Sequence, residues 1–282
     1  MADLPNRVRL VIFDLDGVIY RGAEAVRGAP ELVAWLHDVG VPVRFATNNS
    51  MVTRDAYVER LGAIGIATDV EEIVTSTSAT VDHLAQHAPG VRSVLTIGAD
   101  GMRRELETAG LEVTAAADVH PRLPGGPLDR HFDAVVVGLD PSVSYDSLSS
   151  AMAAVADGAR LIATNADSRY PTPAGFLPGA GAIVAALATA TGVTPEVIGK
   201  PEPAMFRSII EACGLPAADC VVIGDNPEAD VAGAHRAGCA SILVLTGVAD
   251  SSTVASLAGE RRPDAVAAGP SEVRRLLEGR VS

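Results

Sequence analysis

Cysteine and aromatic residues are both scarce in this chain. Its 282 residues include three Cys and one Trp, and Phe, Trp and Tyr together make up 4% of the total. The number of cysteines is odd and none of them forms a C-x-x-C pair, which argues against a disulfide framework and against a zinc site. Hydrophobic residues nevertheless reach 48%. The core must therefore be built largely from Ala, Val, Leu and Ile.

Positive charge and long apolar runs are scarce as well. The formal net charge of −13 argues against nucleic acid or an anionic membrane as a partner. Asp14 and Asp16 interrupt the only apolar run near the N-terminus, so a signal-peptide pattern is missing. The longest apolar helix pattern, residues 180–191, is too short to span a bilayer. We expect a cytoplasmic protein in a reducing compartment.

Lysine is almost absent. Of the 22 basic residues 21 are Arg, and the single lysine is Lys200, directly before Pro201. Arginine presents a wide planar fork, whereas lysine presents a compact point charge. A site that needs a small ammonium between a phosphate and a carboxylate would accept only lysine. The alternative is that one lysine survived a codon bias by chance.

Short apolar segments alternate with amphipathic segments through the first part of the chain. This pattern predicts strands at residues 8–13, 41–46 and 73–75 and helices at residues 30–39, 53–64 and 79–88. Strands that alternate with helices in this way form parallel sheets with right-handed crossovers.

A second alternation begins near residue 91, and the first pattern resumes near residue 195. The second predicts strands at residues 91–97, 111–113, 132–137 and 160–163, helices at 102–109, 145–156 and 180–191, and loops at 115–130 and 164–178. The last part predicts helices at residues 202–213, 228–237 and 271–277 and strands at 221–223, 241–245 and 265–267. We predict an α/β protein with a Rossmann-like parallel-sheet core, residues 1–87 and 195–282, interrupted by an inserted α/β domain, residues 88–194.

Polar residues stand where apolar strands end, or beside the sole lysine. They are Asp14 with Asp16, Thr47 with Asn48, Lys200, and Asp225 with Asp230. The carboxyl ends of parallel strands meet at one edge of a sheet, which is where ligands bind, so these groups should converge. Taken singly, each has a simpler explanation as a turn or a helix cap. Their joint occurrence favours a site.

The types of these residues suggest phosphoryl transfer. Asp14 would be the nucleophile that forms an aspartyl-phosphate, and Asp16 would protonate the leaving alcohol and then activate water. Thr47 would hold phosphate oxygens, and Lys200 would neutralise the phosphoryl group and keep Asp14 ionised. Mg²⁺ would be held by Asp14, the backbone carbonyl of Asp16, and Asp225.

The order of these motifs resembles that of the haloacid dehalogenase superfamily of phosphohydrolases. The resemblance is carried by Asp14-x-Asp16-Gly17, Thr47-Asn48-Asn49-Ser50, Gly199-Lys200-Pro201 and Gly224-Asp225 with Asp230. It is similar in particular to the large-cap branch of p-nitrophenyl phosphate, phosphoglycolate, pyridoxal phosphate and nucleotide phosphatases. In that branch an α/β cap domain lies between the second and third motifs, where this chain has its insertion.

The resemblance also implies roles for further residues. Thr47, Asn48 and Asn49 would bind phosphate, and a cap loop with Asn165, Asp167 and Tyr170 would contact the substrate, Tyr170 being the position where specificity varies. Asn226 and Asp230 would support the metal site. Glu228 stands where the family often has a further Asp, which leaves its own role open.

We therefore expect a Mg²⁺-dependent phosphatase for small phosphorylated metabolites. A phosphotransferase or mutase, or a non-catalytic sensor of a phosphorylated metabolite, are the alternatives on the same fold. The sequence leaves the substrate open among phosphoglycolate, glycerol phosphate, pyridoxal phosphate and nucleoside monophosphates. Caps of this type often pair, which suggests a homodimer through the cap, and no nucleic acid or membrane partner is expected.

Overall fold

The chain folds into two compact units. The computed structural model describes residues 4–121, 123, 125–172 and 174–281. One unit, the core unit, contains the chain up to Thr47, Arg54–Val74, and the chain from Lys200 onward. The other, the inserted unit, contains Asn48–Thr53 and Thr75–Gly199. Each unit holds its own sheet, which confirms the predicted α/β class with an insertion in a Rossmann-like core.

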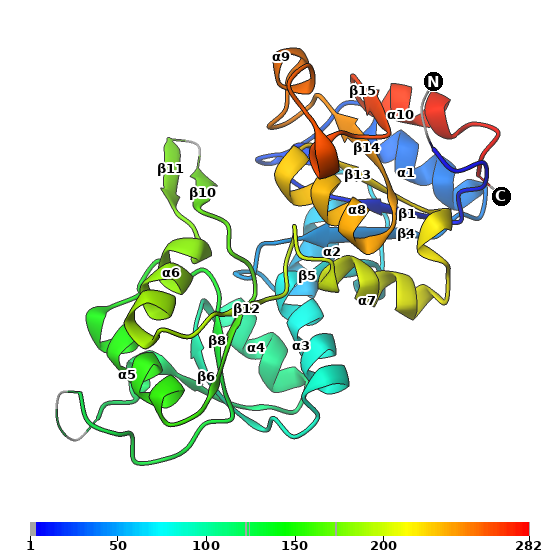
Figure 1. The fold of residues 1–282 in the computed structure, drawn as a ribbon. Coiled ribbons are helices and arrows are strands. Elements are labelled where there is room, and N and C mark those ends of the chain that lie inside the picture. The colour runs from blue at the N-terminus through cyan, green and yellow to red at the C-terminus, as the bar shows by residue number, and fades with distance from the viewer. Residues whose placement is uncertain (1–3, 122, 124, 173, 282) are drawn as a thin grey trace. The chain divides into compact units, whose positions relative to one another are not determined.

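The core unit is built on a six-stranded sheet in the order β15-β14-β13-β1-β4-β5 (Figure 1). In that order the strands span Ala265–Ala267, Ala240–Val244, Cys220–Gly224, Leu10–Phe13, Val43–Thr47 and Ile73–Thr75. The pairs from β15 to β4 are parallel. Helices α1 (Ala29–Asp38) and α10 (Pro270–Leu277) cover one face, and α7 (Ala204–Cys213) and α8 (Ala232–Ala237) cover the other.

Strand β1 occupies the centre of this sheet. Its residues Leu-Val-Ile-Phe are between 0% and 1% exposed, because helices cover both faces and a two-sided strand must be apolar throughout. The chain runs from β1 to β4 and β5 on one side, and the later strands β13, β14 and β15 follow on the other. The strand order thus reverses beside β1. Open α/β sheets bind their ligands at such a reversal.

The core unit also contains shorter elements. A hairpin of β2 (Tyr20–Arg21) and β3 (Glu24–Ala25) follows β1, and the sequence did not predict it because each strand has only two residues. The others are α2 (Arg54–Ala63), α9 (Ser251–Val254) and the 3₁₀ turns Val70–Glu72, Ala217–Asp219 and Gly259–Arg261.

The helix predicted at residues 228–237 has two parts. A π-helical turn, Pro227–Val231, precedes α8. The Asn226 side chain accepts the N–H groups of Glu228 and Ala229 at 3.0 and 3.3 Å, and the Asp230 side chain accepts the N–H of Asn226 at 3.1 Å. These side-chain bonds shape the first turn, and hydrophobic periodicity carries no information about them.

The inserted unit has a five-stranded parallel sheet in the order β12-β9-β8-β6-β7. The strands span Glu196–Val197, Arg160–Ala163, Ala134–Val137, Ser93–Ile97 and Glu112–Ala115. Helices α5 (Tyr145–Ala156) and α6 (Ala180–Thr191) pack together on one side of it, and α3 (Ser76–His87) and α4 (Asp100–Thr108) on the other. A 3₁₀ turn, Ala116–Asp118, follows β7.

The unit boundaries differ from the predicted domain boundaries at residues 87/88 and 194/195. The division falls at Val74/Thr75 and at Gly199/Lys200. The reason at the first boundary is that α3 packs against α4, and the Thr75 hydroxyl donates to the buried carboxylate of Glu105 at 2.9 Å. The sequence pattern of α3 is that of any amphipathic helix, so it could not reveal which unit the helix joins.

The predicted loop at residues 164–178 contains an antiparallel hairpin, β10 (Arg169–Thr172) with β11 (Gly175–Pro178). Its proline and glycine content masked the strands, which form an isolated two-stranded ribbon with little burial. Residue 173 of this segment, and residues 122 and 124 of the predicted loop at 115–130, lie outside the described residues.

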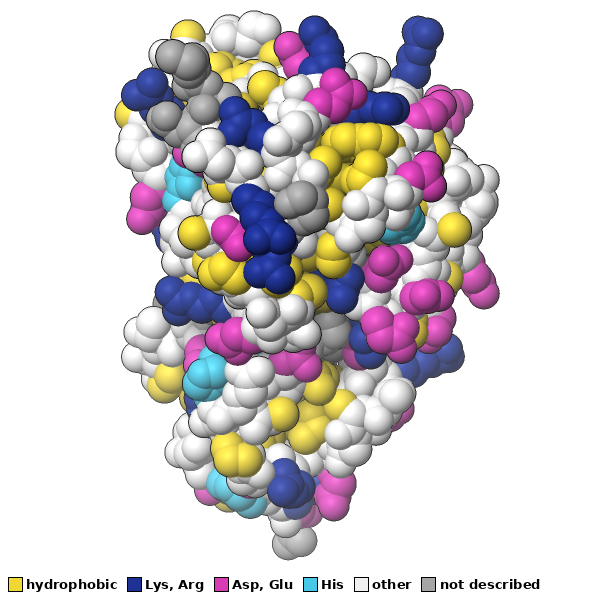
Figure 2. Space-filling view, turned by 90° about the vertical axis from the view of Figure 1, so that its right-hand side faces the viewer, with side chains coloured by type: hydrophobic (Ala, Val, Ile, Leu, Met, Phe, Trp, Pro, Cys, Tyr) yellow, Lys and Arg dark blue, Asp and Glu magenta, His cyan; other side chains and the backbone are white. Residues whose placement is uncertain are grey.

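On the face drawn in Figure 2, acidic and basic side chains are interspersed, with hydrophobic side chains scattered between them. Within the described part of the chain, the helices are all too short or too polar to cross a bilayer.

Candidate active site

The carboxyl edge of the core sheet gathers the charged residues singled out from the sequence. Asp14 follows β1 directly, and its N–H donates to the carbonyl of Ile223 on β13 at 2.9 Å. Asp225 follows β13, and Thr47 is the last residue of β4 and is only 4% exposed. Three strands that neighbour one another at the reversal of the sheet thus deliver these three side chains.

Lys200 reaches the same edge and is 2% exposed. Its ammonium donates to Asp14 Oδ1 at 2.5 Å, to Asp230 Oδ1 at 2.8 Å and to the carbonyl of Ala46 at 3.1 Å. Burial by itself lowers the pKa of Lys200, but the two carboxylates outweigh it and raise that pKa above its ordinary value. The lysine therefore stays charged inside the protein.

Asp225 is held by backbone on two sides. Its Oδ2 accepts the N–H of Val248 at 2.7 Å, and its carbonyl accepts the N–H of Ala249 at 3.1 Å. Gly17 lies against the same carboxylate in a left-handed conformation (φ +81°), and a Cβ there would be 2.3 Å from Oδ2. Only glycine fits this position, so Gly17 of the Asp-x-Asp-Gly motif makes room for Asp225.

One carboxylate oxygen from each of Asp14, Asp225 and Asp230 lies within 4.8 Å of the other two. Among the residues that the structure describes, Lys200 forms the ion pairs with this cluster. Three carboxylates and one ammonium leave an excess of two negative charges when all four groups are ionised. Burial raises the pKa of Asp14 well above its usual range; Lys200 lowers it, and Asp230 and Asp225 raise it further. A divalent cation with a preference for oxygen ligands, such as Mg²⁺, fits both the charge and the donor set.

Asp230 and Asn226 support this cluster from the π-helical turn. Asp230 uses one carboxylate oxygen for Lys200 and the other for the N–H of Asn226. Its position suits it to anchoring the lysine. Glu228, by contrast, has a side chain that is 65% exposed and lies 3.6 Å from Arg261, in a surface ion pair away from the acidic cluster.

Asp16 stands apart from the three clustered carboxylates. It is exposed, and its Oδ2 accepts the phenolic O–H of Tyr20 at 3.4 Å. Burial of the surrounding site raises the pKa of Asp16, while Arg60 and the Tyr20 hydrogen bond lower it. Sequence reasoning missed Tyr20 and Arg60, because Tyr20 belongs to an unpredicted hairpin and Arg60 is an ordinary charged residue on a helix.

Three of the residues that the family resemblance assigned to phosphate or substrate bind one another within the inserted unit. The Asn48 side-chain amide donates to both carboxylate oxygens of Asp167 at 3.1 Å. The Asn165 amide donates to the carbonyl of Asn48 at 2.7 Å, and its oxygen accepts the N–H of Asp167 at 3.2 Å. This network joins the segment after β4 to the segment after β9.

Asn49 and Tyr170, also predicted to bind substrate or phosphate, contact residues close to them in the fold. The Asn49 side chain accepts the N–H of Met51 at 2.8 Å, which closes a turn. Tyr170 lies half-buried on β10, opposite Leu177 of β11. Contact of either residue with a substrate stays a prediction.

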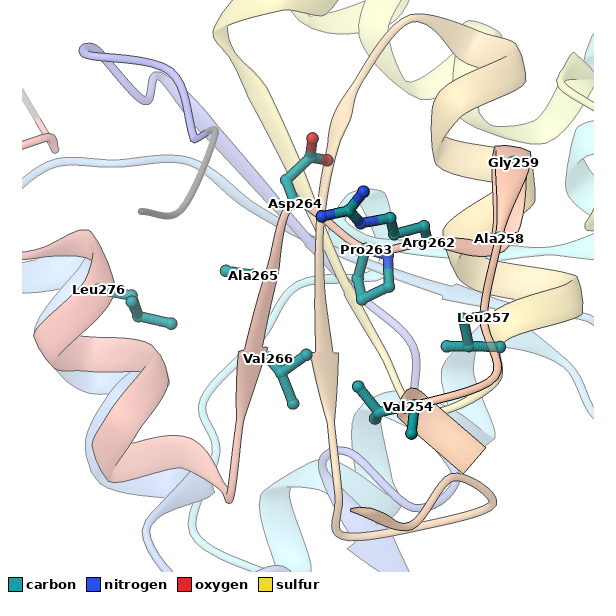
Figure 3. A pocket seen from close by; sticks show the side chains of 11 residues that line it. Val254, Leu257, Ala258, Gly259, Arg262, Pro263, Asp264, Ala265, Val266 and Leu276 are labelled. Carbon is teal, nitrogen blue, oxygen red and sulfur yellow. The ribbon is translucent and has the colours of Figure 1, made fainter. Parts of the chain in front are cut away.

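One surface hollow lies away from this edge. A cavity of about 700 Å³ is formed by α9, the turn after it, β15 and α10, and is lined mainly by apolar side chains such as Val254, Leu257 and Leu276 (Figure 3). Its lining contains none of the charged residues described above. The chemistry of the site is therefore indicated by the cluster of charged groups, not by cavity size.

Comparison with known proteins assigns the family. A model described as haloacid dehalogenase-like hydrolase matches residues 11–112, and one described as HAD-hydrolase-like matches residues 197–272. An acid sugar phosphatase of Staphylococcus aureus is 37% identical over 86% of this chain and 88% of its own length.

Two solved structures have the same fold. A p-nitrophenyl phosphatase from Archaeoglobus fulgidus has a TM-score of 0.85 at 32% identity, covering 96% of this chain and 100% of that one. A glycerol phosphate phosphatase from Mycobacterium tuberculosis, in complex with magnesium, has a TM-score of 0.82 at 32% identity, covering 94% and 76%. The chain is therefore a phosphoric monoester hydrolase and belongs to the haloacid dehalogenase-like hydrolases, in the branch of the p-nitrophenyl phosphatases.

Proposed function

We propose that the protein is a Mg²⁺-dependent phosphatase that hydrolyses small phosphomonoesters through an aspartyl-phosphate on Asp14. The observation that carries this proposal is the buried ammonium of Lys200, hydrogen-bonded to Asp14 and Asp230 at the point where the sheet order reverses. The names of the relatives, an acid sugar phosphatase and a glycerol phosphate phosphatase, support a small phosphorylated metabolite as substrate.

In the first step an Asp14 carboxylate oxygen attacks phosphorus and the bond from phosphorus to the alcohol oxygen breaks. The electron pair of that bond goes to the alcohol oxygen, which takes a proton from Asp16. Lys200 lies beside Asp14 and faces the negative charge of the phosphoryl oxygens. Thr47, at the end of β4, supplies a hydroxyl for the phosphate.

In the second step water attacks the phosphorus of the aspartyl-phosphate. Asp16, now ionised, takes the proton from this water, and the bond between phosphorus and the Asp14 oxygen breaks, which restores Asp14 and releases phosphate. The position of Asp16 outside the acidic cluster supports this role, because its carboxylate is exposed to an incoming molecule.

Mg²⁺ held by Asp14, the backbone carbonyl of Asp16, and Asp225 would supply positive charge to the phosphoryl oxygens. Two observations support this ligand set. Asp225 is fixed by the backbone N–H of Val248 and by the space that Gly17 leaves, and both oxygens of Asp230 are already engaged by Lys200 and Asn226.

Replacing Asp14 and Asp16, the two aspartates that follow β1, distinguishes the role of the nucleophile from that of the acid. We expect Asp14→Asn to abolish phosphate release, and Asp16→Asn to keep substrate binding while slowing turnover by ~10²-fold or more, because it removes only proton transfer. Steady-state phosphate release with Mg²⁺ measures both. Asp219→Asn, a change of the same kind near the surface, should behave as wild type. Binding of phosphomonoesters by the wild-type protein without turnover would identify a sensor instead, and transfer to an added alcohol a phosphotransferase.

Lys200→Arg tests the need for a compact cation. We expect a loss of ~10²-fold in turnover although the charge is kept, since a planar guanidinium cannot direct donors at three acceptors around one nitrogen. The opposite exchange at the surface, Arg9→Lys in the ion pair with Asp219, should have little effect. Near-normal turnover in Lys200→Arg would contradict the role proposed for the lysine.

Metal affinity should depend on pH through Asp225. Burial and the charge of Asp230 raise the pKa of Asp225 to about 7 in the metal-free protein. A proton and Mg²⁺ compete for this carboxylate, so Mg²⁺ affinity should fall by about tenfold per pH unit as the pH drops below 7, with proton release on binding. Titration calorimetry in buffers of different ionisation enthalpy measures both quantities. Affinity that does not change with pH would rule out Asp225 as a ligand with a raised pKa.

Substrate preference should respond to Tyr170. Its place on the exposed hairpin of the inserted unit and the family resemblance support a role in selection. We expect Tyr170→Ala to re-rank a panel of phosphomonoesters by roughly tenfold in kcat/KM while p-nitrophenyl phosphate stays a substrate. Tyr145→Ala, at a side chain 85% exposed on α5, is the control. A uniform loss over all substrates would mark Tyr170 as structural.

A further inference from the structure

We propose that Tyr20 and Arg60 are positioning residues that hold the carboxyl group of Asp16 in the orientation from which it protonates the departing alcohol. This inference rests on the proposed role of Asp16 as the acid. It assigns a specific purpose to two residues outside the sequence motifs, and all of the groups involved belong to the core unit.

A tight turn after β1 brings Tyr20 back to Asp16. The carbonyl of Leu15 accepts the N–H groups of Ile19 and Tyr20 at 2.9 and 3.2 Å, and the N–H of Gly17 donates to the carbonyl of Tyr20 at 2.8 Å. The phenolic O–H then reaches Asp16 Oδ2 at 3.4 Å. Because Tyr20 is only 1% exposed, its ring cannot swing away, and the exposed carboxyl group has a fixed donor on one oxygen.

Arg60 holds that tyrosine from α2. Its guanidinium carbon lies 3.7 Å from the centroid of the Tyr20 ring, a cation–π contact, and the same guanidinium donates to the carbonyl of Gly22 at 2.6 Å. Gly22 lies between the two strands of the hairpin, and Tyr20 is the first residue of the first strand. The guanidinium of Arg60 therefore contacts both the ring of Tyr20 and the backbone two residues after it.

Arg60 also supplies charge near the acid. Arg60 and Lys200 both lower the pKa of Asp16, and the effect of Arg60 is the larger of the two. This charge accompanies the contact with the Tyr20 ring through which Arg60 acts on the carboxyl group of Asp16.

The hydrogen bond also determines which oxygen carries the proton. The carbonyl oxygen of a carboxylic acid accepts hydrogen bonds better than its hydroxyl oxygen. Donation by Tyr20 to Oδ2 therefore favours Oδ1 as the oxygen that carries the transferable proton. The proton moves from Oδ1 to the alcohol oxygen while the bond from that oxygen to phosphorus breaks. Without the tyrosine hydroxyl, the exposed carboxyl group rotates, and fewer encounters present the protonated oxygen to the leaving group.

A leaving-group series distinguishes positioning of the acid from a general structural role. An alkyl phosphate such as glycerol phosphate releases a strongly basic alkoxide and needs the proton, whereas p-nitrophenyl phosphate releases a weakly basic phenolate and needs little help. We expect Tyr20→Phe, which keeps the ring for Arg60, and Arg60→Gln each to lower kcat/KM by ~10-fold for glycerol phosphate but by less than about twofold for p-nitrophenyl phosphate. The parameter kcat/KM is chosen because it reports the step in which the ester bond breaks.

Two controls accompany the series. Arg274→Gln removes the same charge and another cation–π contact of the core unit, with Trp35, and should change neither substrate. Asp16→Asn removes the acid itself, so adding Tyr20→Phe to it should cause no further loss with glycerol phosphate, because residues that act through one group are not additive. Thermal unfolding of each variant checks that it is folded.

The outcomes separate the inference from the function on which it rests. An equal loss with both substrates in Tyr20→Phe and Arg60→Gln, or a further selective loss when Tyr20→Phe is added to Asp16→Asn, would overturn the positioning role alone. Equal losses with both substrates in Asp16→Asn itself would overturn the assignment of Asp16 as the acid, and the inference with it. Should Tyr20→Phe not fold, Arg60→Gln, at a half-buried side chain, decides the question.

Discussion

The ammonium of Lys200 is the interaction on which the rest of the site depends. Asp14 and Asp230 both accept from this one buried nitrogen, and they come from opposite ends of the chain. Without it, buried carboxylates would face one another with no internal cation between them, at a cost of several kcal/mol. The sheet supports the arrangement, because β1, β4 and β13 are neighbours and deliver their end residues to one edge.

The aspartates around this ion pair differ in their surroundings. Asp14, Asp225 and Asp230 are crowded into one cluster with a negative excess, which suits them to binding a divalent cation. Asp16, two residues after Asp14, leaves the strand and sits exposed beside a tyrosine and an arginine. The same type of side chain therefore stands in two different electrostatic environments within one site.

Much of this arrangement could be predicted from local sequence. Local features predicted an α/β fold, its insertion and the family, all of which are confirmed. These features are the apolar run of β1 with its two carboxylates, the sole lysine and the strand before Asp225. Elements whose signal is short or non-local were missed: the two-residue strands after Asp16, the exposed ribbon at residues 169–178 and the membership of α3 in the inserted unit. The two hairpins form by backbone pairing of neighbouring segments, and α3 joins its unit by packing against α4, and the hydrophobic periodicity of the chain marks neither.

The sequence by itself determined which chemistry is available, because residue types and their places at strand ends are local properties. Tertiary structure alone decided which partner each of those residues contacts. Asp230 binds the lysine, Glu228 joins a surface ion pair, and Asn48 binds Asp167. It also brought Arg60 onto the ring of Tyr20. The physical reason is that a hydrogen bond or ion pair is set by distances of a few ångströms between side chains, and spacing along the chain does not specify those distances.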